Sequence, residues 1–516
     1  MTGPRTTTPG TSSTRSISSS SAPRIESRRK FFADRCRGTK VRSDPWRRRP
    51  QGASVIHEGR TMTNTPAVRV TRGIETLRAA VTGEVLTERD TGYQTANHTL
   101  TRQGRPAVVV RCASAADIAA ALAYAEANDL VVSVRSGGHH MAGFGTNDGG
   151  VVIDVRPLDE VTLVSDGPGE KATFRIGTGA TWGTVAAYLA KTGHAISSGD
   201  TAGVGVGGLM AGGGIGWMVR RHGLAIDSVE AAEVVTADGS VRRVDATAEP
   251  ELFWGLRGAA GGLGVVTSYD ISAVHQPTVL FGSLLFPWTQ ADQVLSGWAD
   301  HMAVAPDELT SSVQLPPTMV ADRQAPVAIK VCVAGDAAGR EEILAPLRSL
   351  GTVLTDTVTE VPYAQVLADE AMPPGWTPRN RNGLFDAWSP DLGERLADAR
   401  LRLPAMAVEV RALGGAFGRV ARHATAFAHR DARFMVNAVL IGSTELHGDQ
   451  IEGFEALWAE LMPEGAYLNF LSDPTAADLD RCYPGPHRAR LAALKQTVDP
   501  ADVFRTALTV PPAVSG

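Results

Sequence analysis

Two glycine-rich segments constrain the fold of this chain more than any other feature. The first, VRSGGHHMAGFGTNDGGVVIDV, runs from Val134 to Val155, and the second, SGDTAGVGVGGLMAGGGIG, runs from Ser198 to Gly216. Glycine permits positive φ and exposes successive backbone N–H groups, which suits a diphosphate that needs many donors and no side-chain bulk. The two segments together predict one long nucleotide cofactor, with its diphosphate at one segment and its ring system near the other.

The first glycine segment follows a strand–helix–strand pattern. PAVVVRC, from Pro106, predicts a strand, and LVVSV, at 130–134, predicts the next one. Between them, Ser114 with Asp117 three residues later predicts the N-cap of a helix. The glycine turn is therefore expected at the carboxyl end of a strand in a βαβ unit, where open α/β sheets usually bind ligands.

The same alternation continues along the first half of the chain. Strands are predicted at VVIDV and ATFRIGTGA, a helix at TWGTVAAYLAKTG that ends at Gly193, and a hairpin that turns at Asp238 and Gly239. A further helix is expected from Pro250. After Gln276, the strands LFGSLLFPW and PVAIKVCVAG and the amphipathic segment REEILAPLRSLG predict a second domain.

Charge separates an N-terminal tail from the rest of the chain. Residues 1–61 carry fourteen Arg or Lys against four acids, so the remaining chain has a net charge of about −15. We expect the tail to be disordered, because its few apolar residues cannot offset the cost of ordering it. SRRKFF, from Ser27, resembles a twin-arginine export signal but lacks the apolar segment that follows one, so a cytoplasmic location is expected. From Met62 onward the sequence is more typical of a globular domain. The net negative charge of the chain after the tail disfavours a nucleic-acid-binding function.

Several other classes of site are disfavoured by the sequence. The four cysteines, Cys36, Cys112, Cys332 and Cys482, form no C-x-x-C pair, which disfavours a zinc ribbon or a disulfide framework. No H-x-x-x-H or H-E-x-x-H pattern predicts a metal site, and no apolar run is long enough to span a membrane. The formal G-x-G-x-x-G that begins at Gly203 follows SSGDTA rather than a buried strand, which disfavours a Rossmann fingerprint.

Taken in order, these motifs resemble those of the berberine-bridge-enzyme-like, vanillyl-alcohol-oxidase-type (PCMH-type) FAD oxidases. The resemblance rests on RSGGH, DGGVVIDV, RIGTGATWG, GVGVGGLMAGGGIG, LFWGLRGAAGGLGVVTS, TAFAHR, YLN and RLAALKQTVDPADVFR, and it runs from about Tyr93 to Pro511. Among bacterial members, the sequence pattern most resembles those of 6-hydroxy-D-nicotine oxidase and the actinobacterial antibiotic-tailoring oxidases. The resemblance implies an α+β, two-domain fold: an FAD-binding domain at 62–276, with its core at about 102–276, and an antiparallel-sheet-plus-helices substrate domain at 277–461. Residues 462–516 would form a C-terminal segment that packs back on the FAD domain.

The resemblance also implies how FAD is held. The family's histidine in R-S-G-G-H, here His139, bonds covalently to the flavin 8α-methyl carbon, and His140 has no such role and is expected to lie behind it or at the surface. Arg135 either contacts the cofactor or forms a structural ion pair. The expected cofactor-binding residues are Arg135, Ser136, Gly137, Gly138, His139, Gly143, Thr201, Val204, Gly205, Gly208, Gly212, Gly216, Val265 and Asn469.

Three positions are informative when this chain is compared with that family. Some relatives add a second flavin bond through a cysteine, but here the corresponding residue is Thr201, so a single histidyl link is expected. Three residues later, Val204 occupies the position that controls oxygen access, and valine there accompanies oxidases. Ala507 stands where the family tail often has an asparagine, which removes one expected polar contact near the cofactor.

Candidate catalytic residues lie in the second half of the chain. Tyr467, in YLN, is implied to be the base or substrate positioner over the flavin, and Asn469 should share its strand face and reach the cofactor. Glu409 and Arg411 alternate to one strand face, either as an ion pair that lines the pocket or as a structural pair. Arg430 has no assigned role.

The predicted activity is oxidation of a C–O or C–N bond of a small organic substrate, with dioxygen as the electron acceptor. Few charges in the second domain's strands favour an apolar or aromatic substrate such as an alkaloid, polyketide or glycosylated natural product. The alternatives are an FAD dehydrogenase, an NADPH-dependent reductase that shares the FAD domain, and a non-catalytic flavin- or nucleotide-binding protein.

Overall fold

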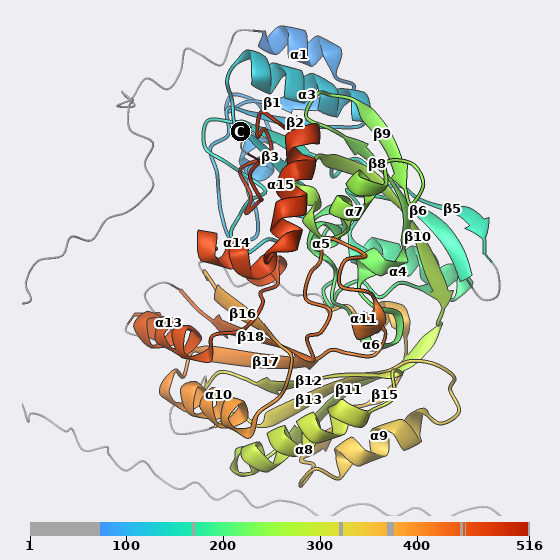
Figure 1. Cartoon of the computed structure of the whole chain (residues 1–516), viewed down its shortest axis with the longest axis vertical. Helices are drawn as coiled ribbons and strands as arrows, with labels where there is room; N and C mark the ends of the chain where they lie inside the picture. Colours follow the sequence, from blue (N-terminus) through green and yellow to red (C-terminus); the bar gives the residue numbers. More distant parts are fainter. Residues whose placement is uncertain are drawn as a thin grey trace, which may run out of the picture. The chain divides into compact units, whose positions relative to one another are not determined.

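The computed structural model describes residues 73–167, 171–318, 324–368, 376–443, 447–448 and 450–513. The chain divides into two units, Met1–Asn64 and Thr65–Gly516, and all described residues belong to the second. The tail predicted at 1–61 therefore lies outside the described residues. The second unit combines helices with largely antiparallel sheets (Figure 1), which confirms the predicted α+β class. None of the helices in the described ranges is long and apolar enough to cross a membrane.

The first sheet has the strand order β1-β2-β4-β3 and contains the parallel strands of the fold. Strand β4 lies between β2 and β3 and is parallel to both. Helix α3 connects β2 to β3, which allows these two strands to run in the same direction. Ser114 caps α3 as predicted, since its side chain accepts a hydrogen bond from the Asp117 backbone N–H. The elements of this region are α1 (Ile74–Ala80), β1 (Glu84–Leu86), α2 (Tyr93–Ala96), β2 (Val108–Arg111), α3 (Ala115–Ala127), β3 (Val132–Arg135) and β4 (Val151–Asp154).

The second sheet follows in sequence and has the order β5-β6-β10-β8-β9, with β7 paired to β10. The predicted hairpin is present as β8 and β9, and Gly239 takes a φ of 77° in its turn. Helix α7 begins at Pro250 as predicted. The strands are β5 (Val161–Asp166), β6 (Lys171–Gly177), β7 (His194–Ala195), β8 (Val229–Val235), β9 (Val241–Asp245) and β10 (Val265–His275). The helices and 3-10 turns are α4 (Trp182–Leu189), η1 (Ala190–Thr192), α5 (Val206–Gly212), α6 (Val219–His222), η2 (Ala225–Ser228), α7 (Pro250–Ala259) and η3 (Ala260–Gly262).

The third sheet is antiparallel, with the order β14-β11-β13-β12-β17-β18-β16 and β15 paired to β11. Its strands are β11 (Thr278–Phe286), β12 (Leu309–Leu315), β13 (Val327–Val333), β14 (Thr355–Asp356), β15 (Thr359–Pro362), β16 (Arg379–Phe385), β17 (Met406–Ala412) and β18 (Phe434–Leu440). Its helices and 3-10 turns are η4 (Trp288–Gln290), α8 (Ala291–Val304), α9 (Arg340–Arg348), η5 (Tyr363–Val366), α10 (Pro390–Arg402), α11 (Ala416–Arg419) and α13 (Gln450–Leu461).

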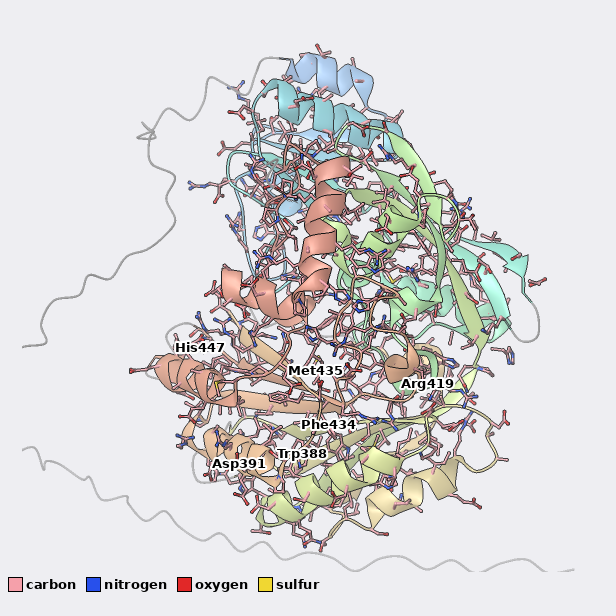
Figure 2. All side chains as sticks on the ribbon, viewed as in Figure 1. Trp388, Asp391, Arg419, Phe434, Met435 and His447 are labelled. Carbon is pink, nitrogen blue, oxygen red and sulfur yellow. The ribbon has the colours of Figure 1, made fainter. Side chains whose placement is uncertain are left out.

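The two faces of this third sheet have different neighbours. Phe434 and Met435 are consecutive in β18 and point to opposite sides of the sheet (Figure 2). Phe434 belongs to the core beneath the helices, where its ring centroid is 5.6 Å from that of Trp388. Met435 belongs instead to the core shared with the second sheet. One face of the sheet therefore packs on α8, α9, α10 and α13, and the other faces the first half of the chain (Figure 1).

The C-terminal segment returns to the first half of the chain. It contains η6 (Leu468–Phe470), α14 (Ala476–Cys482) and α15 (Pro486–Val498), and α15 contacts α7 (Figure 1). Tyr483 Oη donates to the Gly258 carbonyl at 2.9 Å, and Thr506 Oγ1 donates to the Val132 carbonyl at 2.6 Å. These contacts fix the end of the chain to α7 and β3, although the domain boundaries themselves stay a prediction.

Candidate functional site

A cavity of about 920 Å³ lies where the first half of the chain, the third sheet and the C-terminal segment meet. Its walls come from both glycine-rich segments, from β12, β17 and β18, from η6, and from residues 507–510 near the C-terminus. Segments far apart in the sequence thus share one chamber, which is large enough for a nucleotide cofactor and a small substrate together.

The two glycine-rich segments pack directly on each other beside this cavity. A Cβ atom on Gly205 would lie 2.1 Å from both Gly137 N and Ser136 Oγ, and one on Gly137 would lie 2.4 Å from Gly205 N. No side chain fits between two backbones at such distances, so both positions require glycine. Ser136 Oγ also donates to the Thr178 carbonyl at 2.6 Å, which fixes the first segment against the second sheet.

His139 lies half-buried in the cavity wall at the start of the first segment's turn. A Cβ atom on Gly203 would lie 3.1 Å from both Cε1 and Nε2 of this histidine, so a side chain at position 203 would crowd the imidazole. Burial lowers the pKa of His139 below its usual value, which keeps the ring neutral near pH 7. A neutral imidazole has a nitrogen lone pair available for attack on an electrophile.

Arg135 is held by protein groups, although it also lines the cavity. Its Nη2 donates to Asp154 Oδ2 at 2.6 Å, and its Nη1 donates to the carbonyls of Ala96 and, at 3.1 Å, His98. Asp154 also pairs with Arg156 at 2.6 Å. The structure therefore supports the ion-paired interpretation of Arg135, and its contact with a cofactor stays a prediction.

Tyr467 and Asn469 lie together, but the expected strand is wrong. Tyr467 precedes the 3-10 turn η6, and this turn, rather than strand alternation, brings the two side chains to one side. Tyr467 Oη accepts hydrogen bonds from the Gly214 N–H and from Asn469 Nδ2, both at 3.0 Å. Asn382 on β16 holds the tyrosine backbone, because its Oδ1 accepts from Tyr467 N at 2.7 Å and its Nδ2 donates to Tyr467 O at 2.8 Å. Burial raises the pKa of Tyr467 to about 12.

The structure brings most of the predicted residues to the cavity. Those that line it are Arg135, Ser136, Gly137, Gly138, His139, Thr201, Val204, Gly205, Gly208, Tyr467 and Asn469. Four others lie outside the lining, namely Gly143, Gly212, Gly216 and Val265.

Each of the four packs against protein. A Cβ atom on Gly212 would lie 2.4 Å from Asn469 Oδ1, one on Gly143 would lie 2.8 Å from Arg102 Cβ, and one on Gly216 would lie 2.9 Å from Ser198 N. Val265 is buried in the core of the first sheet. In this structure these residues shape the walls, and any direct cofactor contact by them stays a prediction.

The sequence interpretation missed polar groups that the third sheet contributes. Gln314, Asn380 and Asn437 line the cavity together with Glu409. These residues come from different strands, so only the strand pairing brings them together, and no local sequence pattern could have indicated it. Lys495 also lines the cavity, where it donates to the Phe504 carbonyl at 2.9 Å and pairs with Asp502 at 2.6 Å.

His140 was expected behind the wall or at the surface, but it lines the cavity. Its Nδ1 accepts a hydrogen bond from the Ala142 backbone N–H at 3.1 Å. Burial lowers the pKa of His140 to about 4, so this second imidazole is also neutral near pH 7.

Arg411 joins carboxylates from both halves of the chain. Its Nη2 donates to Asp200 Oδ2 at 2.7 Å and to both Glu409 oxygens at 3.0 Å. Asp200 and Glu409 both line the cavity. The Glu409–Arg411 pair, which was predicted to be either structural or pocket-lining, therefore has both roles. Arg430, by contrast, is buried in a two-bond pair with Asp227, at 2.8 and 2.7 Å.

Comparison with known proteins agrees with this geometry. Residues 106–245 match the family described as FAD binding domain. The chain is 30% identical to (R)-6-hydroxynicotine oxidase of Paenarthrobacter nicotinovorans, over 84% of this chain and 97% of that protein. The crystal structure of 6-hydroxy-D-nicotine oxidase from Arthrobacter nicotinovorans superposes with a TM-score of 0.74 at 29% identity, over 84% of this chain and 98% of that one.

A more distant structural neighbour is glucooligosaccharide oxidase from Acremonium strictum. It superposes with a TM-score of 0.74 at 23% identity, over 85% of this chain and 99% of that one. Its published description names a 6-S-cysteinyl, 8α-N1-histidyl FAD in that protein. At this identity the likeness supports the shared fold.

Proposed function

Because the chain belongs to the berberine-bridge-enzyme-like, PCMH-type FAD-linked oxidoreductases, we propose that it is an oxidase that carries its FAD on His139 and reduces dioxygen. The reaction would oxidise a C–O or C–N bond of a small organic substrate. The observation that carries this proposal is a neutral imidazole in the wall of a cavity that also contains Tyr467 and two carboxylates. We also propose that 62–276 with 462–516 hold FAD and that 277–461 cover the substrate.

The cavity residues fit FAD. Both glycine segments present backbone to the cavity, and a Cβ atom on Gly208 or Gly261 would meet nothing within 4 Å, so open space lies directly above these glycines. In our proposal, the backbone N–H groups of residues 136–138, Gly205 and Gly208 hold the cofactor, and His139 holds it covalently. Thr201 has a hydroxyl rather than a thiol, which restricts the attachment to one bond.

The side chains around the cavity divide the remaining tasks. When bound, FAD supplies the two-electron acceptor for a hydride from the substrate carbon. Tyr467, with a pKa raised to about 12, is a neutral phenol near pH 7. Since its oxygen already accepts two hydrogen bonds, its own proton is available to orient the substrate's reacting oxygen or nitrogen. The proton that leaves the substrate then passes to a carboxylate, and Asp200 and Glu409 are the cavity-lining candidates.

Dioxygen as electron acceptor is supported by Val204. This half-buried residue lines the cavity between Thr201 and Gly205, and its backbone carbonyl accepts from Trp182 N at 3.0 Å. A short aliphatic side chain in this wall leaves space for a diatomic molecule. Stopped-flow mixing of the reduced protein with air-saturated buffer should show rapid reoxidation, whereas slow reoxidation would point to a dehydrogenase.

Replacing His139 tests the attachment. We expect acid precipitation of the purified protein to leave yellow colour in the pellet, and His139→Ala to release it into the supernatant. His140→Asn is the matched control, because it changes the adjacent cavity-lining imidazole and should retain the covalent colour. Colour retained by His139→Ala, or a bare polypeptide mass for the yellow wild-type protein, would contradict the proposal.

A further inference from the structure

A row of polar side chains crosses the third sheet on the face that meets the cavity. Gln314 on β12 lies opposite Glu409 on β17, which lies opposite Asn437 on β18, which lies opposite Asn382 on β16. Paired residues on neighbouring strands share one face of a sheet, so the four side chains form a continuous row. The alternate residues on β17 and β18, including Val408 and Val436, belong to the apolar core under the helices.

Hydrogen-bond acceptors dominate the part of this row that lines the cavity. Glu409 has two carboxylate oxygens there, and these accept from Arg411 Nη2 and, at 3.4 Å, from Gln314 Nε2. The Oδ1 atoms of Asn437, in this row, and of Asn380, elsewhere on β16, are buried and have no hydrogen-bond partner among the described residues. An amide group offers both a donor and an acceptor, whereas a carboxylate only accepts, so Glu409 sets the character of the wall.

The cations that balance this charge lie behind the wall. Arg411 is buried, and its Nη1 donates to the Ile215 carbonyl at 3.2 Å; although burial alone would lower its pKa, Glu409 and Asp200 raise it. Burial alone would raise the pKa of Asp200, but Arg411 and Lys330 on β13 lower it. The Nζ atom of Lys330 lies 5.1 Å from the centroid of the Trp217 ring. In the described part of the chain, both carboxylates line the cavity and neither of these two cations does.

The remaining titratable groups of the cavity do not compensate the carboxylates. Arg135 is paired with Asp154, and Lys495 is paired with Asp502. His139 and His140 have pKa values lowered by burial and are therefore neutral near pH 7. The carboxylate oxygens of Glu409 and Asp200 thus face the cavity while their cations lie behind them, and a positive or proton-donating group placed beside them on the cavity side is favoured.

We propose that Glu409, with Asn437 beside it, recognises a protonated nitrogen on the substrate, and that Arg411 is the positioning residue that holds Glu409 in the wall. This inference rests on the proposed oxidase function and names the substrate class as amines. It replaces the expectation of an apolar substrate, which followed from the small number of charges in these strands. Three of the polar residues that these strands carry, Gln314, Glu409 and Asn437, line the cavity.

Three small probes with one aromatic frame test this proposal without knowledge of the natural substrate. We would titrate benzylamine, benzyl alcohol and benzoate into the FAD-loaded protein at pH 7 and measure their dissociation constants by isothermal calorimetry. Benzylamine should bind at least about tenfold more tightly than benzyl alcohol, as expected for one charge-assisted hydrogen bond, and benzoate should bind most weakly. Equal affinities, or a preference for benzoate, would overturn the proposal.

Variants then assign the preference to Glu409. Glu409→Gln keeps the shape of the side chain and removes its charge, so the ratio of benzylamine to benzyl alcohol affinity should fall towards one while benzyl alcohol binding changes little. Glu308→Gln is the matched control, because Glu308 pairs with Arg221 at 2.7 Å outside the cavity lining, and it should keep the wild-type ratio. If Asp200→Asn removes the preference and Glu409→Gln does not, the assignment to Glu409 is wrong.

The positioning role of Arg411 has a separate readout. Arg411→Lys keeps the charge but cannot reach both carboxylates with one planar group, so it should reduce the benzylamine preference. In a protein that already carries Glu409→Gln, adding Arg411→Lys should reduce the preference no further. A further loss in the double variant would contradict the positioning role. The wild-type probe series remains decisive even if a variant does not fold. Covalent yellow colour without an amine preference would refute this inference alone, whereas a colourless protein would refute the proposed oxidase function.

Discussion

Tyr467 combines a structural and a functional role, so Tyr467→Phe should lower both stability and turnover. The substitution removes one oxygen and keeps the ring, which packs against Phe470 with ring centroids 5.3 Å apart. Apolar packing should therefore survive, and the measured losses should come from the hydroxyl group. We expect the variant to remain folded and yellow.

The loss of stability can be derived from the two donors that the hydroxyl satisfies. Asn469 Nδ2 keeps a second partner, the Leu209 carbonyl at 3.2 Å, so its cost is small. The Gly214 N–H is buried and loses its acceptor among the described residues. One stranded buried donor costs about 1–3 kcal/mol in the free energy of unfolding. Because the hydroxyl would also orient the substrate, turnover should fall by a factor of about 100 or more.

Thermal unfolding followed by circular dichroism and single-turnover flavin reduction measure the two effects separately. Tyr93→Phe is the matched control, since Tyr93 is a buried tyrosine outside the cavity lining whose hydroxyl donates to the Pro106 carbonyl at 2.5 Å. It should lose stability of a similar order and keep the rate of flavin reduction. If Tyr467→Phe keeps wild-type stability and reduces flavin at the wild-type rate, the hydrogen-bond argument and the positioning role both fail.

Other parts of the structure give further predictions. Gly205→Ala should destabilise the protein by about 1–3 kcal/mol because its Cβ overlaps Gly137 and Ser136, whereas Gly208→Ala should leave stability unchanged or higher and lower FAD content, as measured by unfolding and by flavin absorbance per polypeptide. Asp227→Asn should cost about 3–5 kcal/mol because it leaves the buried guanidinium of its partner unpaired, and equal thermal midpoints would refute this. Burial lowers the pKa of His222 to about 4, so its contribution to stability is complete above pH 6.5 and is lost as the pH falls through 4; His222→Gln should flatten the acid loss in a pH series of unfolding experiments.

Local patterns predicted the elements that depend on neighbouring residues. The N-cap at Ser114, the turn at Gly239 and the start of α7 at Pro250 all lie where the sequence placed them. Each depends on the conformational preference of one or two residues, and that preference is visible in a short window. The predicted strand at Tyr467 was wrong: Tyr467 precedes a 3-10 turn, and its backbone N–H and C=O both bond to the side chain of Asn382 on β16.

The candidate site was predictable where it lies within the glycine segments. His139, Thr201 and Val204 all line the cavity, and the contacts with FAD that the family resemblance implies for them stay a prediction. The opposite wall was not predictable, because it requires the strand order of the third sheet. That Gln314 should lie opposite Glu409 follows only from the pairing of β12 with β17. Because the strand register was unknown, the sequence also did not reveal that Gln314, Glu409 and Asn437 form a polar row within this wall.

Arg411 shows why the two halves of the site depend on each other. Its guanidinium takes one carboxylate, Asp200, from the second glycine segment and another, Glu409, from its own strand. Burial of this cation is tolerable only because both anions are present, and each anion is held at the cavity only while the cation lies behind it. The third sheet is thereby fixed to the segment that also carries Thr201 and Val204. A substrate that binds Glu409 is consequently positioned relative to the flavin-binding wall by a buried ion pair, which is a more rigid connection than a contact between loops.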